Sequence, residues 1–272
     1  MKFSLLLLSL FLASCSGTAS NSANVIGSNT AMASPTPVST ANVQTVTIDS
    51  ADGVKLVASM YGATKANSGA LLLMHQWQSD RHSYDDFAAK MQAEGFAVLS
   101  IDARGFGESI KKSDGSPVAA GRTDADVKGM LGDVDAAFNY LSKQANVDPK
   151  RVGIVGASYA SSLAIIYAAD HPDVGAVALL SPGLNYFGNI PTEPAVKKYG
   201  DRNLILFAAE DDKESADAVR KLNPTGIDRP KYPENIFASG GHGTALLKAG
   251  AGEEMGEFFG RVFDLANLHL KN

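Results

Sequence analysis

Residues 151–169 read RVGIVGASYASSLAIIYAA, and this stretch decides how the chain is expected to fold. Its first five residues form a short apolar run typical of a buried strand, and its last ten form a helix-like run. Ser158 therefore falls on a sharp turn between strand and helix. Gly156 and Ala160 flank it, two residues away on either side, as such a turn requires, because the two backbones pass close together there.

The turn at Ser158 has two interpretations. It can lift the hydroxyl out of the fold and aim the following backbone N–H groups at the atom under attack, which makes a nucleophile elbow. Alternatively, it is an ordinary turn whose serine caps the helix that follows. The five-residue pattern is too common to decide between them, so the decision depends on partners elsewhere in the chain.

Composition limits the classes of function. The chain has 272 residues, of which 45% are hydrophobic and 19% are charged, as in a globular protein with an ample core. A net charge of −5 offers no basic surface, so we expect no nucleic-acid partner. Cys15 is the only cysteine, which excludes an internal disulfide and a cysteine metal cluster.

The N-terminus carries a separate signal. Lys2 precedes an apolar stretch over residues 5–12 that is too short to span a bilayer, and LASC follows at residues 12–15. This pattern resembles a bacterial lipoprotein signal. The resemblance implies cleavage before Cys15, a lipid on its thiol and, because Ser16 is not an aspartate, sorting to the outer membrane, facing the periplasm. The alternative is an ordinary secretory signal with an incidental cysteine.

The rest of the chain is expected to form one tethered domain. Residues 16–42 are rich in Ser, Thr, Asn, Ala and Pro and carry no charge, so they cannot bury enough surface to offset the entropy of ordering. The predicted organisation is a signal segment over 1–15, a flexible tether over 16–42 and a domain over 43–272, which we expect to be monomeric.

The domain is expected to begin with two antiparallel strands and then to alternate strands with helices. The predicted strands cover residues 43–48, 54–61, 70–74, 97–101, 152–155, 176–180, 204–208 and 236–238. The predicted helices include 83–94, 123–144, 160–169 and 244–268. This order implies a mostly parallel sheet with helices on both faces.

Chemically active residues follow several of these strands. In open parallel sheets the active site lies beyond the carboxyl ends of the strands. Ser158 follows the fifth strand, the acidic run Glu210-Asp211-Asp212 follows the seventh, and His242 lies between glycines after the eighth. The chain order of serine, acid and histidine is that of α/β-hydrolases.

Four segments together resemble the α/β-hydrolases, in particular esterases of the dienelactone-hydrolase-like and serine-aminopeptidase-like kinds. They are residues 72–77 (LLMHQW), 102–109 (DARGFGES), 156–160 (GASYA) and 241–243 (GHG). The resemblance covers nearly all of the domain. It implies an α/β-hydrolase fold with an eight-stranded, mostly parallel sheet, and it requires no cofactor. The family's usual glycine after His75 is replaced by Gln76, and Ala160 ends the elbow. Dienelactone hydrolases use a cysteine nucleophile, so Ser158 puts their particular substrate in doubt.

The resemblance assigns roles at the strand ends. Ser158 would be the nucleophile, and His242 the base that takes its proton and returns it to the leaving group. Family esterases carry the acid about four residues past the strand, which favours Asp212, with Asp211 as the rival and Glu210 more remote. The oxyanion hole would use the backbone N–H groups of Tyr159 and Trp77.

For each of these residues, a purely structural role is the alternative to a catalytic one. His242 could be a surface histidine, and the Trp77 ring could serve the core. Asp102 and Arg104 resemble a structural pair that fixes a loop. The other histidines are expected outside the chemistry: His82 and His269 on solvated helices, His171 at a helix end and His75 in a structural place. None of these has metal-ligand spacing with an acid.

Three functions remain open at this level. The first is a lipid-anchored carboxylesterase that forms an acyl-enzyme on Ser158. The second is a peptidase of the serine-aminopeptidase-like type, and the third is a cell-envelope lipoprotein that binds without catalysis. The span from 182 to 201 is too short for a cap domain, so we expect an open site that takes small or polymer-end esters.

Overall fold

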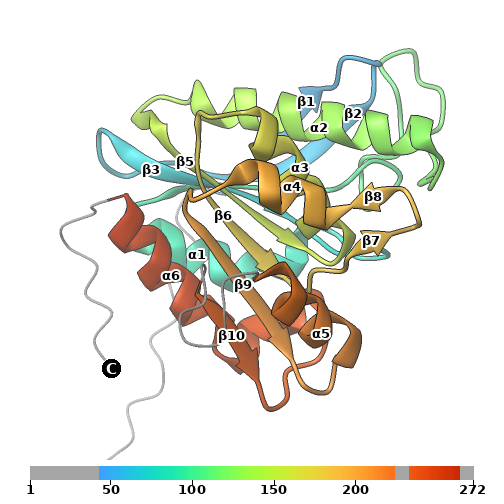
Figure 1. The fold of residues 1–272 in the computed structure, drawn as a ribbon. Helices are drawn as coiled ribbons and strands as arrows, with labels where there is room; N and C mark the ends of the chain where they lie inside the picture. The colour runs from blue at the N-terminus through green and yellow to red at the C-terminus, as the bar shows by residue number, and fades with distance from the viewer. Residues whose placement is uncertain (1–42, 224–232, 264–272) are drawn as a thin grey trace, which may run out of the picture. The chain divides into compact units, whose positions relative to one another are not determined.

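A computed structural model describes residues 43–223 and 233–263, and an eight-stranded β-sheet forms their centre (Figure 1). The strands lie in the order β1-β2-β4-β3-β5-β6-β9-β10. Their bounds are β1 Val43–Asp49, β2 Lys55–Tyr61, β3 Ser68–Met74, β4 Ala97–Ile101, β5 Val147–Ala157, β6 Val174–Leu180, β9 Leu204–Ala209 and β10 Glu234–Phe237. Cys15, the expected signal and tether, and His269 lie outside the described residues.

The sheet is mostly parallel, as the sequence predicts. β2 pairs antiparallel with β1 on one side and with β4 on the other, and all the later neighbours are parallel. Gly53, with φ 85°, makes the turn between β1 and β2. The parallel strands point their carboxyl ends to one edge, so the residues that follow them come together.

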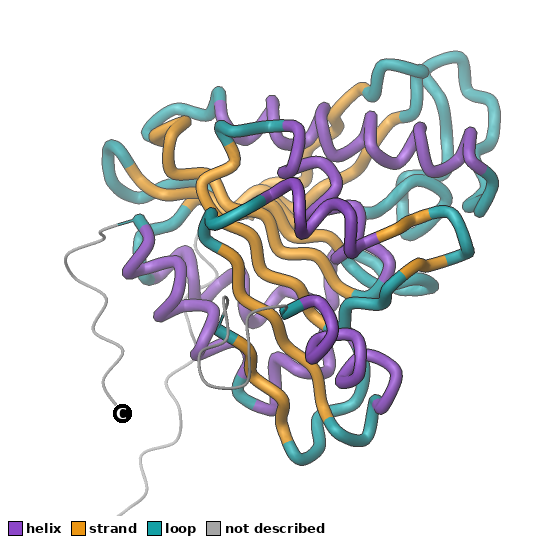
Figure 2. The backbone as a smooth tube through the Cα atoms, in the orientation of Figure 1, coloured by secondary structure: helices purple, strands orange, loops and turns teal. Residues whose placement is uncertain are grey.

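Helices cover both faces of the sheet (Figure 2). The helices α2 Asp124–Ser142, α3 Tyr159–Asp170, α4 Thr192–Tyr199 and α5 Lys213–Leu222 share one hydrophobic core, and α1 Asp85–Ala93 and α6 Ala251–Val262 share the other. In β3, Leu72 belongs to the first core, while Leu71 and Leu73 belong to the second. Burial on both faces explains why the central strands are continuous apolar runs.

The helix α2 agrees with its predicted bounds to within two residues. Thr123 caps it, since its hydroxyl accepts from the Asp126 N–H at 3.3 Å and the Asp126 carboxylate accepts from the Thr123 N–H at 2.8 Å. This reciprocal pair satisfies donors that the first turn would leave without partners. The predicted apolar stripe faces the core; its buried members are Val127, Met130, Val134, Ala137, Phe138 and Leu141.

The helix predicted over residues 244–268 is wrong in its continuity. The structure has a 3-10 helix, η2 Gly243–Ala249, followed by α6. Gly250, with φ 117°, separates them because this left-handed conformation cannot continue a helix. The helix predicted over residues 83–94 is also divided. A 3-10 turn, η1 Arg81–Tyr84, precedes α1.

The segment between β6 and β9 holds a short hairpin and α4. Strands β7 Asn185–Tyr186 and β8 Ile190–Pro191 pair antiparallel and form this hairpin. No cap domain occurs between residues 182 and 201, as expected. Across residues 43–223 and 233–263, no helix combines the length and the apolar character that crossing a bilayer demands.

The expected pairing of Asp102 with Arg104 is wrong. Asp102 is fully buried and binds the guanidinium of Arg81, whose backbone N–H also donates to it at 2.7 Å. Arg104 instead binds Asp133 at 2.6 and 2.7 Å and Asp52 at 2.7 Å. The two residues sit just past the end of β4, and their side chains diverge to separate acids. Both still fix loops rather than perform chemistry.

The turn around Ser158 has no room for a larger residue at position 156. A Cβ atom added to Gly156 would lie 2.2 Å from the carbonyl oxygen of Ala160, which is backbone and cannot swing away. Gly62 offers a contrast, because an added Cβ there would meet no atom within 4 Å.

We therefore expect Gly156→Ala to destabilise the domain by about 1–3 kcal/mol, as overpacking does. Such a loss lowers the melting temperature by several degrees in a domain of this size. Circular dichroism during thermal unfolding measures it, with Gly62→Ala as the control that should leave the melting temperature nearly unchanged. Equal shifts in the two variants would contradict the packing argument.

Candidate active site

Ser158 has a strained backbone that its neighbours hold in place. It lies between β5 and α3 with φ 57° and ψ −127°, and only 6% of its surface is exposed. Its N–H donates to the carbonyl of Leu180 at 2.8 Å, and its own carbonyl accepts from the N–H of Ser161 at 2.9 Å. Positive φ at a residue with a side chain costs about 1–3 kcal/mol and persists only when surrounding contacts fix it.

His242 connects Ser158 to an acid. Its Nε2 lies 2.7 Å from the Ser158 Oγ, and its Nδ1 lies 2.6 Å from the Asp212 Oδ2. The histidine follows β10 and directly precedes η2, between Gly241 and Gly243, whose φ angles are 69° and 63°. These two glycines let the loop turn the ring toward Ser158. A hydrogen-bonded chain of acid, imidazole and hydroxyl results.

The three acids after β9 have different contacts. Asp212 alone among them bonds to the imidazole of His242. The Asp211 carboxylate accepts from the backbone N–H groups of Gly240 and Gly241 at distances between 3.1 and 3.3 Å, so it holds the histidine loop. Glu210 forms an ion pair with Arg220.

Asp212 is held in its charged form. Burial by itself would raise the pKa of its carboxyl, but hydrogen bonds from Ser215 and His242 outweigh that effect and hold the pKa below its usual value. Its side chain is 16% exposed, against 44% for His242. The carboxylate is therefore negative at neutral pH, where it can orient the imidazole and stabilise its cation.

Two residues of the site were not identified in the sequence. Ser181 directly follows β6, has φ 49°, and accepts from the Gly243 N–H at 2.9 Å. Tyr186, in β7, donates to the Ser181 carbonyl at 2.8 Å. Burial raises the pKa of Tyr186 to about 12, so the phenol stays neutral.

The two expected oxyanion donors are the backbone N–H groups of Tyr159 and Trp77. Tyr159 is the first residue of α3, where a backbone N–H has no partner within its own helix. The rings of Trp77 and Tyr159 meet edge to face, with centroids 5.5 Å apart. The Trp77 ring also packs against Phe106 at 4.8 Å and Phe187 at 5.0 Å. It is therefore one wall of an aromatic cluster next to the serine.

His75 and Gln76 fix the strand end that carries Trp77. The His75 Nε2 accepts from the Ala103 N–H at 3.0 Å, its Nδ1 donates to the Gln76 carbonyl at 2.7 Å, and burial lowers its pKa, so the ring is neutral. The Gln76 Oε1 accepts from the Thr244 N–H at 3.3 Å. The residue that departs from the family pattern thus joins the end of β3 to the histidine loop.

The other histidines lie away from this arrangement. His82 is exposed and bonds to Asp85 at 2.9 Å, and His171 stacks on Tyr167 at the end of α3. Within the two described ranges, no three His, Cys, Asp or Glu side chains are grouped to hold a metal ion.

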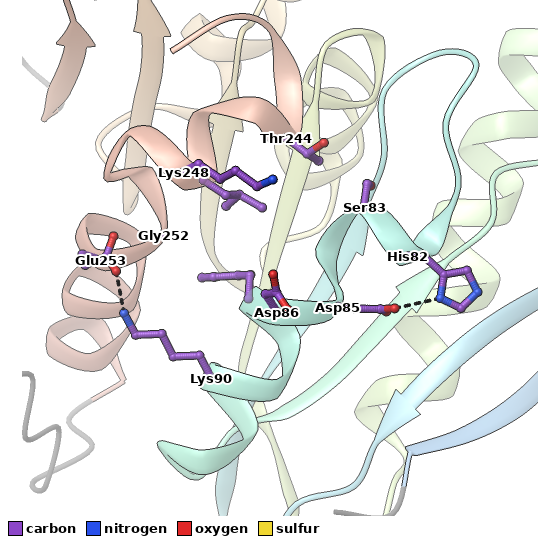
Figure 3. A pocket seen from close by; sticks show the side chains of 11 residues that line it. His82, Ser83, Asp85, Asp86, Lys90, Thr244, Lys248, Gly252 and Glu253 are labelled. Atoms are coloured by element: carbon purple, nitrogen blue, oxygen red, sulfur yellow. Dashed lines mark hydrogen bonds and ion pairs between the residues drawn. The ribbon is translucent and has the colours of Figure 1, made fainter. Parts of the chain in front are cut away.

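A cavity of about 380 Å³ lies between α1 and the η2–α6 segment (Figure 3). Its lining includes His82, Asp86, Lys90, Thr244 and Lys248, and Glu253 forms an ion pair with Lys90 across it. It contains none of the three hydrogen-bonded side chains of the site. The aromatic cluster around Trp77 packs instead against the core shared by α2 and α3.

Comparisons with known proteins identify a family and several relatives of this chain. A family described as serine aminopeptidase, S33, matches residues 65–202. The quorum-quenching protein AidA of Acinetobacter baumannii is 32% identical over 146 residues, 53% of this chain and 45% of that protein. The thiohydrolase aneE of Aspergillus aculeatus is 31% identical over 115 residues, 42% of this chain and 33% of that protein. The matches thus span less than half the length of these curated relatives.

Solved structures show the same fold. An esterase of Pyrococcus furiosus superposes with a TM-score of 0.58 at 19% identity, over 81% of this chain and 91% of that one. Identity this low supports the fold alone. The family match covers half of this chain and includes the strand ends that carry Trp77 and Ser158. The chain belongs to the serine aminopeptidase S33 family of α/β-hydrolases.

Proposed function

We propose that this protein is a serine hydrolase that cleaves carboxylic esters through an acyl-enzyme on Ser158. The observation that carries the proposal is the continuous hydrogen-bonded chain from Asp212 through His242 to Ser158, at 2.6 and 2.7 Å. A serine hydroxyl is a weak nucleophile without a base in reach, and this geometry supplies one. In the alternative function without catalysis, a binding lipoprotein, nothing would require this alignment.

The proposed reaction proceeds in two halves. As the Ser158 Oγ attacks the ester carbonyl carbon, the His242 Nε2 takes the hydroxyl proton and Asp212 stabilises the resulting cation. The carbonyl oxygen becomes an oxyanion, which the N–H groups of Trp77 and Tyr159 would bind. When the tetrahedral intermediate collapses, the C–O bond to the alcohol breaks and His242 returns the proton to the alcohol. Water then repeats these steps on the acyl-enzyme and releases the acid.

The first assays should cover more than one class of cleaved bond. The family name points to peptides and two relatives are thiohydrolases, so amide and thioester substrates belong beside esters. A panel of p-nitrophenyl esters of different chain length, an acyl thioester and an aminoacyl p-nitroanilide separates the three. We expect the short esters to be turned over fastest, because the segment that covers the site is only a hairpin and one helix.

Ser158→Ala is expected to abolish ester turnover to within the background rate and to prevent labelling by a fluorophosphonate probe, since both need the Oγ nucleophile. Activity is followed by p-nitrophenolate release and labelling by in-gel fluorescence. Ser142→Ala, at the end of α2, removes a serine hydroxyl that bonds to the Phe138 carbonyl; it is the control for loss of a serine and should still be labelled. A folded wild-type protein that the probe does not label would favour the binding function.

Asp212→Asn is expected to lower kcat by about 10³–10⁴, because an amide cannot stabilise the imidazole cation and favours the wrong tautomer. Asp211→Asn is the matched control. Its amide oxygen can still accept from the N–H groups of Gly240 and Gly241, so kcat should change by no more than a few fold. Steady-state kinetics on one p-nitrophenyl ester measure both variants, and the reverse order of effects would make Asp211 the acid.

We further propose that Cys15 carries a lipid that anchors the protein to the bacterial outer membrane, facing the periplasm. The support is the short apolar stretch that ends in LASC. In a bacterial host, Cys15→Ser should move the protein from the membrane pellet to the soluble fraction and remove labelling by radioactive palmitate. Ser16→Asp should keep the lipid but retain the protein at the inner membrane. Unchanged fractionation of Cys15→Ser would contradict the anchor.

A further inference from the structure

Arg122 lies over the aromatic cluster next to the site. Its guanidinium carbon is 4.6 Å from the centroid of the Trp77 ring and 4.8 Å from that of Phe187. The two rings meet edge to face with centroids 5.0 Å apart, so the guanidinium rests against both. The residue itself is exposed. The aromatic contacts fix where the cation lies, while solvent reaches its N–H groups.

The Arg122 side chain differs from the other arginines in residues 43–223 and 233–263. Each of the others has a carboxylate or carbonyl partner; they are Arg81, Arg104, Arg151, Arg202, Arg220 and Arg261. No hydrogen bond or ion pair joins the Arg122 guanidinium to any residue in those ranges. The nearest acid along the chain, Asp124, accepts from the Asn189 side chain at 2.9 Å. Five N–H donors are thus left for a ligand.

Backbone contacts also hold Arg122 in position. The Asn189 side-chain amide, between β7 and β8, donates to the Arg122 carbonyl at 3.0 Å as well as to Asp124. This pair of bonds ties the hairpin to the start of α2. The bond to its carbonyl fixes the backbone of Arg122 beside the hairpin, and the two aromatic rings fix where its guanidinium lies.

Contacts between side chains connect Arg122 to the proposed reaction centre. Trp77, on which it rests, would supply one oxyanion donor, and the Trp77 ring contacts Tyr159, the residue after the nucleophile. The Trp77 ring thus links Arg122 to the residue that follows the nucleophile. A planar guanidinium with free N–H groups matches a carboxylate, which it can bind through two parallel hydrogen bonds.

We propose that Arg122 binds a carboxylate of the substrate, so that this enzyme prefers small esters that carry a free carboxylate on their acyl or their alcohol part. The inference rests on the proposed ester hydrolysis and adds the substrate class. Arg122 has no part in the bond-breaking steps, and its contribution is to bind and orient one charged end of the substrate.

Paired substrates test the preference for a carboxylate and show whether that carboxylate belongs to the acyl or the alcohol part of the ester. Mono-(4-nitrophenyl) adipate against 4-nitrophenyl hexanoate places the charge on the acyl part, and 4-acetoxybenzoate against its methyl ester places it on the alcohol part. In each pair the ratio of kcat/KM for the charged to the neutral ester is measured. For at least one pair, Arg122→Gln should lower that ratio by about tenfold or more, as expected for the loss of a charge-assisted hydrogen bond.

Two further variants sharpen the result. Lys128→Gln removes the same charge from an exposed position on α2 and should leave the ratio as in the wild type. Arg122→Lys keeps the charge but loses the planar fork, so it should recover the ratio only in part. If Arg122→Gln leaves both ratios unchanged while the wild type turns over the neutral esters, the inference is overturned and the proposed hydrolysis stands.

A binding measurement judges the site without catalysis. Trp77 is the only tryptophan of the chain and lies directly against Arg122, so its fluorescence should report an anion that binds there. Titration with adipate should give a saturable change in the wild type and Lys128→Gln, and none in Arg122→Gln. If no ester is turned over and the fluorophosphonate probe does not label Ser158, the proposed hydrolysis fails. The titration alone then decides: an Arg122-dependent change supports the anion site, and its absence overturns it.

Discussion

The hydrogen bond between the His242 imidazole and the Ser158 hydroxyl is the contact on which the site depends, and it joins residues 84 positions apart. It exists because β5, β6, β9 and β10 are parallel neighbours whose carboxyl ends meet at one edge. Ser158 reaches it from a strained turn, and His242 reaches it between two glycines with positive φ. Ser158 keeps this strained backbone because its N–H donates to the Leu180 carbonyl at the end of β6 and its carbonyl accepts from the Ser161 N–H in α3.

Two adjacent acids divide the work of placing the imidazole. Asp212 contacts the ring, and Asp211 holds the backbone of the loop that carries it. Ser181 adds a third support, since its hydroxyl accepts from the N–H directly after the histidine. A histidine on a glycine-rich loop would otherwise sample many positions. These contacts reduce that freedom before a substrate arrives, which is the preorganisation that the proposed role of His242 as a base requires.

Much of the fold could be predicted because each signal was local. The strand-to-helix turn at Ser158 and the apolar runs of the central strands follow from short-range steric and burial rules. Ser181 also stands at a strand end, so the same rule could have identified it. Tyr186 and Arg122 could not be found that way, since a hairpin and an aromatic stack bring them to the site. The predicted pairing of Asp102 with Arg104 was wrong for the same reason. Proximity in the sequence does not say which distant acid or base a side chain contacts.

The hairpin of β7 and β8 gives this open site its chemical character. Two consecutive residues make different contacts: Tyr186 donates to the Ser181 carbonyl, and Phe187, with φ 57°, packs against Trp77 and Arg122. Asn189 then ties the same hairpin to the backbone of Arg122. The acid, imidazole and hydroxyl define what reaction the site can perform. The hairpin supplies side chains that lie next to these three groups. Changes in substrate preference among relatives are therefore expected to follow changes in the hairpin and at position 122, with the three hydrogen-bonded side chains kept.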